Sequence, residues 1–162
     1  MMPFRKVLVA VDPAGEDQAK IFDRALSLAA EQDSMLMILG CLKPSTAAEL
    51  DDRVGTMDGL DSSSSLSARD RFQGTELDHS RAWLESLAHK ARQQGREVEV
   101  AVEVGKAGPE ICQAAARWGA DVIVLGLTRR GKFADRLLGS VTHHVVHHAP
   151  CSVLMVHNGG TA

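Results

Sequence analysis

The chain has 162 residues, and its 18 lysines and arginines stand against 21 aspartates and glutamates, which gives a formal net charge of −3. This length allows one domain with a hydrophobic core and is short for two, so we expect a single domain over residues 1–162. The slight acidic excess offers no general attraction to nucleic acids or anionic membranes, and both are disfavoured as partners.

The sequence favours a cytoplasmic protein. The stretch MMPFRKVLVAVDP has only a short apolar run before Asp12, and so lacks the long apolar region of a signal peptide. No run approaches the roughly 18 apolar residues of a membrane span. Cys41, Cys112 and Cys151 are odd in number and share no CxxC spacing, so we expect three reduced, mostly buried thiols.

The beginning of the chain predicts a strand, a helix and a second strand. The valine-rich run at 6–11 is short and apolar throughout, which is typical of a strand buried on both faces, and it stops before Pro13. Apolar residues at spacings of three and four predict a helix over about 17–31. A second short apolar run, MLMILGCL at 35–42, predicts the next strand.

Residues 44–75 differ in composition from the rest of the chain. They contain glycines, aspartates and a run of serines, and have no sustained apolar period. Such a segment within a compact domain is either a functional lid or a disordered insertion, and the sequence leaves both open. A helical pattern resumes over 76–94, before Gly95.

The second half of the chain predicts three more strands separated by two helices. Valines alternate strictly with mostly acidic residues over 97–104, which predicts a strand at a sheet edge with its glutamates facing water. A helix is expected from Gly108 to Gly119, with Trp118 in the core. The remaining predicted elements are a central strand over 121–125, a helix over 140–149 and a strand over 152–156.

Alternating strands and helices of this kind predict an α/β fold with a mainly parallel sheet and helices on its faces. Ligands of such sheets bind beyond the carboxyl ends of the strands. Asp12, Cys41 and Gly126 all lie at that edge. Gly126 also opens a loop with further glycines, which suits a phosphate-bearing ligand because glycine allows backbone N–H groups to approach an anion closely.

The residues from Gly126 to Lys132 fit the G-x4-G-K part of a P-loop. The next residue is Phe133, where a P-loop needs a serine or threonine to hold magnesium, and no helix opens directly after Lys132. We interpret this match as coincidental.

A second pattern fits better. Gly126 is followed after twelve residues by Gly139-Ser140-Val141-Thr142, a valine-rich helix and then APCSVLMV, and this arrangement resembles the C-terminal signature of the universal stress protein family. The resemblance also includes KVLVAVD near the start, and leaves out only about 44–75. It implies a five-stranded parallel sheet of order 3-2-1-4-5 with helices on both faces, of the adenine nucleotide alpha hydrolase-like type. It further implies a homodimer formed through the fifth strand, at 151–157.

In the ATP-binding branch of this family the signature is G-x2-G-x9-G-[ST]. Gly126, Gly139 and Ser140 match it, while Arg129 stands where the second glycine is expected. An arginine there can obstruct the phosphates or pair with them, since a guanidinium matches phosphate oxygens. The site implied by the resemblance comprises Ala10, Val11, Asp12, Cys41, Gly126, Leu127, Thr128, Arg129, Gly131, Lys132, Gly139, Ser140, Val141 and Thr142.

The resemblance implies a stress-response or regulatory protein that binds ATP or a related adenine nucleotide, with or without Mg²⁺. A family member that binds no ATP and serves as a dimerisation module is one alternative, and a weak ATPase or autophosphorylating protein is another. The sequence shows no nucleophile elbow and no evident general base, so no catalytic residue is assigned.

Two further observations leave alternatives open. Asp12 suits either the ribose hydroxyls or the cap of the turn that follows it. His143 with His147, and His144 with His148, are pairs one helical turn apart that can chelate a metal. The sequence offers no acid or cysteine ligand beside them, which favours solvent-facing or dimer-proximal histidines over a metal site.

Overall fold

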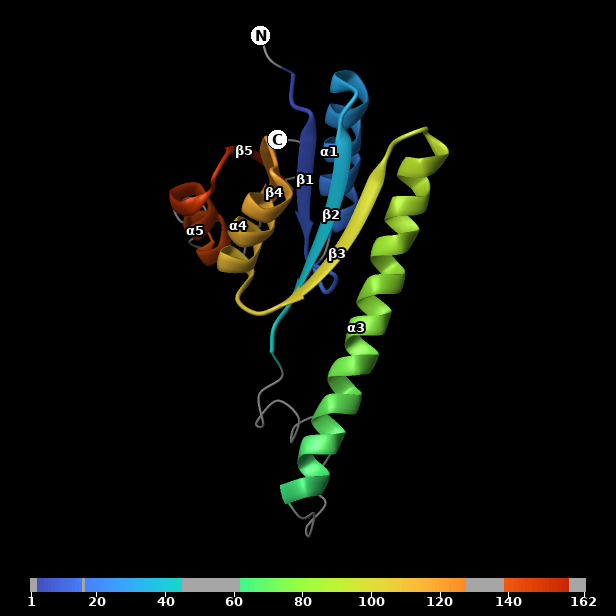
Figure 1. The fold of residues 1–162 in the computed structure, drawn as a ribbon, viewed down its shortest axis with the longest axis vertical. Helices are drawn as coiled ribbons and strands as arrows, with labels where there is room; N and C mark the ends of the chain where they lie inside the picture. Colours follow the sequence, from blue (N-terminus) through green and yellow to red (C-terminus); the bar gives the residue numbers. More distant parts are fainter. Residues whose placement is uncertain (1–2, 16, 45–61, 128–138, 158–162) are drawn as a thin grey trace.

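In a computed structural model that describes residues 3–15, 17–44, 62–127 and 139–157, a parallel sheet forms the centre of the protein (Figure 1). Within these residues the sheet has five strands in the order β3-β2-β1-β4-β5, which confirms the predicted order. The strands are β1 (Lys6–Val11), β2 (Met35–Leu42), β3 (Val98–Val104), β4 (Val122–Leu127) and β5 (Ser152–His157).

The first strand lies in the middle of this sheet. Val9 of β1 is level with Ile38 of β2 on one side and with Val124 of β4 on the other. β1 is buried from Val7 to Val11. Helices cover both faces of this strand, so side chains on either face are buried and apolar residues are favoured at every position, which explains the unbroken apolar run.

Four helices cover the described part of the sheet, two on each face (Figure 1). α1 (Gln18–Gln32) and α3 (Ser62–Gln93) lie on one face, and α4 (Ala107–Trp118) and α5 (Ser140–His148) lie on the other. No helix in the described ranges is both long and apolar enough to cross a membrane.

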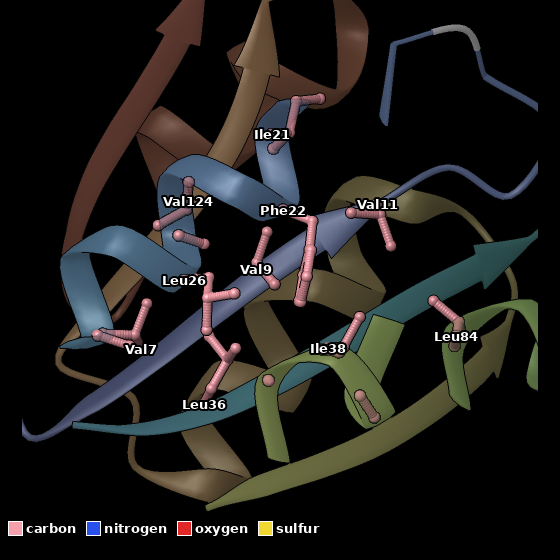
Figure 2. Close-up of a cluster of buried hydrophobic side chains, with 14 of the residues drawn as sticks. Val7, Val9, Val11, Ile21, Phe22, Leu26, Leu36, Ile38, Leu84 and Val124 are labelled. Atoms are coloured by element: carbon pink, nitrogen blue, oxygen red, sulfur yellow. The ribbon is translucent and has the colours of Figure 1, made fainter. Parts of the chain in front are cut away.

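A large apolar cluster fills the space under α1 and α3 (Figure 2). Phe22 of α1 and Leu84 of α3 are fully buried there, against side chains of the central strands. Burying a side chain of the size of Phe22 stabilises a fold by roughly 1.5–3 kcal/mol. α3 packs closely on β2. A Cβ added at Gly40 of β2 would come within 2.8 Å of Leu84 Cδ1 of α3.

The opposite face carries a second cluster, under α4 and α5. Leu8 and Leu39 from the sheet meet Ile111 of α4 and Val145 of α5 in it. Even-numbered residues of β1 therefore point to the α4/α5 face, and odd-numbered residues point to the α1/α3 face.

α3 is the main departure from the expected elements. It begins at Ser62, whereas the sequence predicted a helix only from residue 76. Residues 62–75 of the segment interpreted as a lid or a disordered insertion thus belong to a helix, and 45–61 lie outside the described residues. Once a helix has nucleated on a packed segment, each further residue adds a backbone hydrogen bond at little cost, so the helix extends without an apolar stripe.

β3 is an edge strand, as its alternation predicted, but its glutamates do more than face water. Trp118 Nε1 donates a hydrogen bond of 3.1 Å to Glu99 Oε1, and Arg117 Nη2 lies 2.9 Å from Glu103 Oε1. Both partners come from the end of α4. The polar side of β3 is therefore a contact surface for α4.

Candidate functional site

Several of the predicted site residues meet at the carboxyl edge of the sheet, on its α4/α5 face. Cys41 of β2 is paired in register with Glu103 of β3. Val11 is level with Gly40, so Asp12, the next residue, follows β1 at the level of Cys41. The three side chains form a row across neighbouring strands.

Asp12 caps the turn that leads from β1 towards α1. Its Oδ1 accepts a hydrogen bond of 2.9 Å from the backbone N–H of Ala14, and its backbone carbonyl accepts one of 2.9 Å from Gly15. Its own N–H donates to Gln18 Oε1 at 2.9 Å. The capping role is thereby confirmed, and it holds the carboxylate at the strand end, where a ligand would meet it.

The Cys41 thiol is held in its neutral form. Burial, followed by the negative charges of Glu110, Glu103 and Asp12, raises its pKa to about 12. A neutral thiol is a small, weakly polar group, suited to contact with the face of a planar ligand.

All three cysteines are free, as the sequence predicted, and each is partly buried. Burial also raises the pKa of Cys112 and of Cys151. The thiols pack on the α4/α5 cluster from its margin.

Glu110 is a site residue that the sequence analysis missed. It lies in the first turn of α4, and a Cβ added at Gly105 would come within 2.7 Å of its Oε1. Glu110 thus lies against the end of β3, close enough to Cys41 to influence its pKa. Acidic residues are common in the first turn of a helix, because they interact favourably with the helix dipole, so the sequence alone does not mark Glu110 as a site residue. Its close approach to Gly105 does.

The N-terminus of α5 lies at the same edge of the sheet, because α5 runs back antiparallel to the strands (Figure 1). Gly139 and Ser140 are exposed there, Val141 is partly buried, and Thr142 is buried. Among the residues that the structure describes, no side chain caps this helix, and a Cβ at Gly139 would meet no atom within 4 Å. The first N–H groups of α5 therefore have no partner within the helix and favour an anion.

The remaining predicted site residues divide into two groups. Ala10 and Val11 are buried in β1, so they can contribute backbone groups and apolar contacts to the site but no polar side chains. Gly126 and Leu127 form the end of β4, which ends two residues later than predicted. The remaining predicted site residues, Thr128, Arg129, Gly131 and Lys132, lie outside the described residues.

The charges at this edge are arranged asymmetrically. Carboxylates gather at the ends of β1 and β3 and the start of α4, whereas the uncapped N-terminus of α5 follows β4. Such an edge suits a ligand with hydrogen-bond donors at one end and an anionic group at the other.

The sequence profile of the universal stress protein family matches residues 3–157. Among characterised relatives, Universal stress protein Sll1388 of Synechocystis sp. is 30% identical over 155 residues, which cover 96% of this chain and 99% of that protein. Universal stress protein YxiE of Bacillus subtilis is 30% identical over 156 residues, covering 94% and 99%.

Solved structures share the fold. The hypothetical protein MJ0577 superposes with a TM-score of 0.75 at 17% identity, over 99% of this chain and 100% of that one. A universal stress protein in complex with cAMP superposes with a TM-score of 0.63 at 22% identity, over 97% and 99%. The profile match over nearly the whole chain and the two full-length relatives lead to one conclusion: the chain belongs to the universal stress protein family.

Proposed function

We propose that this protein binds an adenine nucleotide, ATP or a related one, and acts as a cytoplasmic stress-response regulator. The observation that carries the proposal is the exposed, uncapped N-terminus of α5 at Gly139 and Ser140, at the same sheet edge as Asp12 and Cys41. The cAMP complex of a structural neighbour supports an adenine nucleotide as the ligand class.

The phosphates are assigned to the start of α5, where backbone N–H groups of the first turn and the Ser140 hydroxyl donate hydrogen bonds. Asp12 accepts from the ribose hydroxyls, and the Cys41 thiol contacts the base. A Mg²⁺ ion bound with the nucleotide would supply charge neutralisation at the phosphates. Arg129 neutralises phosphate charge if its guanidinium pairs with them.

Titration with a fluorescent ATP analogue tests this assignment. The double variant Gly139→Val, Ser140→Ala should weaken binding by about tenfold or more. It removes a hydroxyl donor, and the valine side chain obstructs the approach of an anion to the backbone N–H groups. The space around Gly139 and its φ of −55° predict that the variant folds. Ser27→Ala, on the exposed side of α1, is the matched control and should bind like the wild type; equal binding by all three proteins would contradict the site.

The rival proposal is slow turnover of the bound nucleotide. We favour binding without turnover, because the carboxylates of the described edge lie at the ends of β1 and β3 and the start of α4, whereas the phosphates are assigned to the start of α5. Overnight incubation with ATP followed by separation of the nucleotides distinguishes the two. Recovery of intact ATP is expected, while ADP in amounts that scale with protein concentration would favour the ATPase.

We also infer a homodimer formed through β5, at 151–157. In the part of the chain that the structure describes, β5 is an edge strand with an open side, and Leu154 and Met155 on it are 42% and 38% exposed, while Val146 of α5 is 43% exposed. Exposed apolar side chains along an unpaired strand are typical of an interface.

Light scattering after size-exclusion chromatography tests the dimer. Leu154→Arg with Met155→Arg should give a monomer, because two charges would be buried at the interface. Val104, on the opposite edge strand, is 38% exposed, so Val104→Arg is the matched control and should leave the dimer intact. A dimer that survives the first change and not the second would place the interface at β3.

A further inference from the structure

The four histidines of α5 form two pairs with different geometry. The rings of His143 and His147 have their centroids 4.5 Å apart and their planes inclined by 54°. The rings of His144 and His148 have centroids 4.2 Å apart and are nearly parallel, with an angle of 16°. The equal spacing in sequence therefore gives two different local structures.

The His144/His148 pair contacts α4 and the backbone of its own helix. His144 is partly buried against α4, where a Cβ at Gly108 would approach its Cβ to 2.8 Å. His148 Nδ1 lies 2.9 Å from the carbonyl oxygen of His144, within hydrogen-bond distance. An ion lies in the plane of the imidazole that binds it, and two nearly parallel planes 4.2 Å apart at their centroids do not meet at one ion. We interpret this pair as structural.

The His143/His147 pair is open to solvent. Both side chains are exposed, on the side of α5 opposite the buried Val145. No hydrogen bond or ion pair to another described side chain occupies either ring, and residues four apart on a helix lie one above the other. Because the two ring planes are inclined by 54°, they intersect, so a single ion can lie in the plane of both rings.

We propose that His143 and His147 bind a divalent first-row transition-metal ion of the class that imidazole prefers, such as Zn²⁺ or Ni²⁺. Neutral imidazole nitrogens coordinate these ions at about 2.0–2.1 Å for zinc, and a pair one helical turn apart supplies two ligands from a rigid backbone. The described part of the chain contains no group of three or more potential ligands, so water completes the coordination shell. This site lies on the same helix as the proposed phosphate site, but it uses side chains that the nucleotide proposal does not, and it does not depend on that proposal.

Calorimetric titration of the nucleotide-free protein with ZnCl₂, repeated with NiCl₂, tests the proposal. The wild type should bind one ion per chain, and its melting temperature should rise with ion concentration because the ion binds the folded helix. His143→Asn with His147→Asn should weaken binding by about tenfold or more.

His148→Asn is the matched control: it removes a histidine of the same helix and should leave binding within about twofold of the wild type. Circular dichroism confirms that each variant is folded. Absence of binding to the wild type would overturn the proposal. So would undiminished binding by the His143→Asn, His147→Asn variant, which would point to the cysteines or the other histidines, and so would a loss of binding in His148→Asn equal to that of the double variant.

Discussion

At the scale of single residues, Cys41 shows how position determines chemical behaviour. Its thiol lies at the end of a parallel strand, where Asp12, Glu103 and Glu110 surround it with negative charge. Partial burial and these carboxylates both disfavour the thiolate. Although Cys41 belongs to the proposed ligand site, it is a poor nucleophile and a poor redox sensor.

Labelling with iodoacetamide at pH 8.5, resolved by mass spectrometry, should therefore find Cys41 the least reactive cysteine. A pKa of about 12 in place of 9.0 lowers its thiolate fraction by about 1,000-fold. Glu110→Gln removes the largest of the charge contributions and should speed the reaction of Cys41 while leaving that of Cys112 unchanged. Cys41 labelled as fast in the folded protein as in urea would contradict this description.

The sequence identified some residues of this edge and missed others for a physical reason. Asp12, Cys41 and Gly126 were found because the carboxyl ends of parallel strands meet at one edge, so position within a strand is enough. Glu110 depends on how α4 packs against Gly105, and no spacing encodes that. Trp118 was expected in the core, yet it is only partly buried, with Lys6 Nζ 5.0 Å from its ring centroid.

At the scale of elements, the contact between α4 and α5 depends on one glycine. Gly108 lies in the first turn of α4, where a Cβ would meet the Cβ, Cγ and Cδ2 atoms of His144 at 2.8–3.0 Å. The Cβ of His144 cannot move without its helix. The absence of a side chain at Gly108 therefore sets how closely α5 approaches α4, and with it the position of the proposed phosphate site.

Gly108→Ala should destabilise the protein by roughly 1–3 kcal/mol, because the two helices must separate. Gly74→Ala makes the same chemical change within α3, where an added Cβ meets no described atom within 4 Å. It should stabilise by about 0.5–1 kcal/mol, since alanine favours the helix over glycine. Urea denaturation of both variants measures the difference, and effects of the same sign would contradict the close packing of α4 on α5.

The helices also show which information the sequence carries. α1, α4 and α5 were predicted to within about two residues because each buries one apolar stripe on the sheet. The start of α3 was not, because its first turns continue the backbone hydrogen bonding of a packed segment and need no such stripe. Apolar periodicity predicts helices that bury one face, and it does not predict a helical segment that extends away from the core.

At the scale of the whole molecule, the sheet separates two apolar clusters, and only one of them borders the proposed ligand site. The α1/α3 cluster contains the largest buried side chain, Phe22, and none of the proposed site residues with polar side chains. The α4/α5 cluster borders Cys41 and the start of α5. Stability and ligand binding should accordingly respond to different substitutions.

Phe22→Leu tests this separation. It leaves a cavity on the α1/α3 face and should lower the free energy of unfolding by roughly 1–2 kcal/mol. The dissociation constant for the nucleotide, measured well below the melting temperature, should remain within about twofold of the wild type. A parallel loss of affinity would mean that the sheet transmits packing changes from one face to the other.

The central place of β1 also has a consequence for the order in which the fold can assemble. β1 and β2 are close in the chain and can pair as soon as both have been synthesised, but the other side of β1 must wait for β4, which begins at Val122. Until then the strand that is most deeply buried in the finished protein has an open edge. Pairing that spans more than a hundred residues is slow, because loop closure precedes any gain from contacts. The nascent chain is therefore most prone to aggregation after β2 and before β4, and it depends at that stage on α1 and α3 to shield β1 from one side.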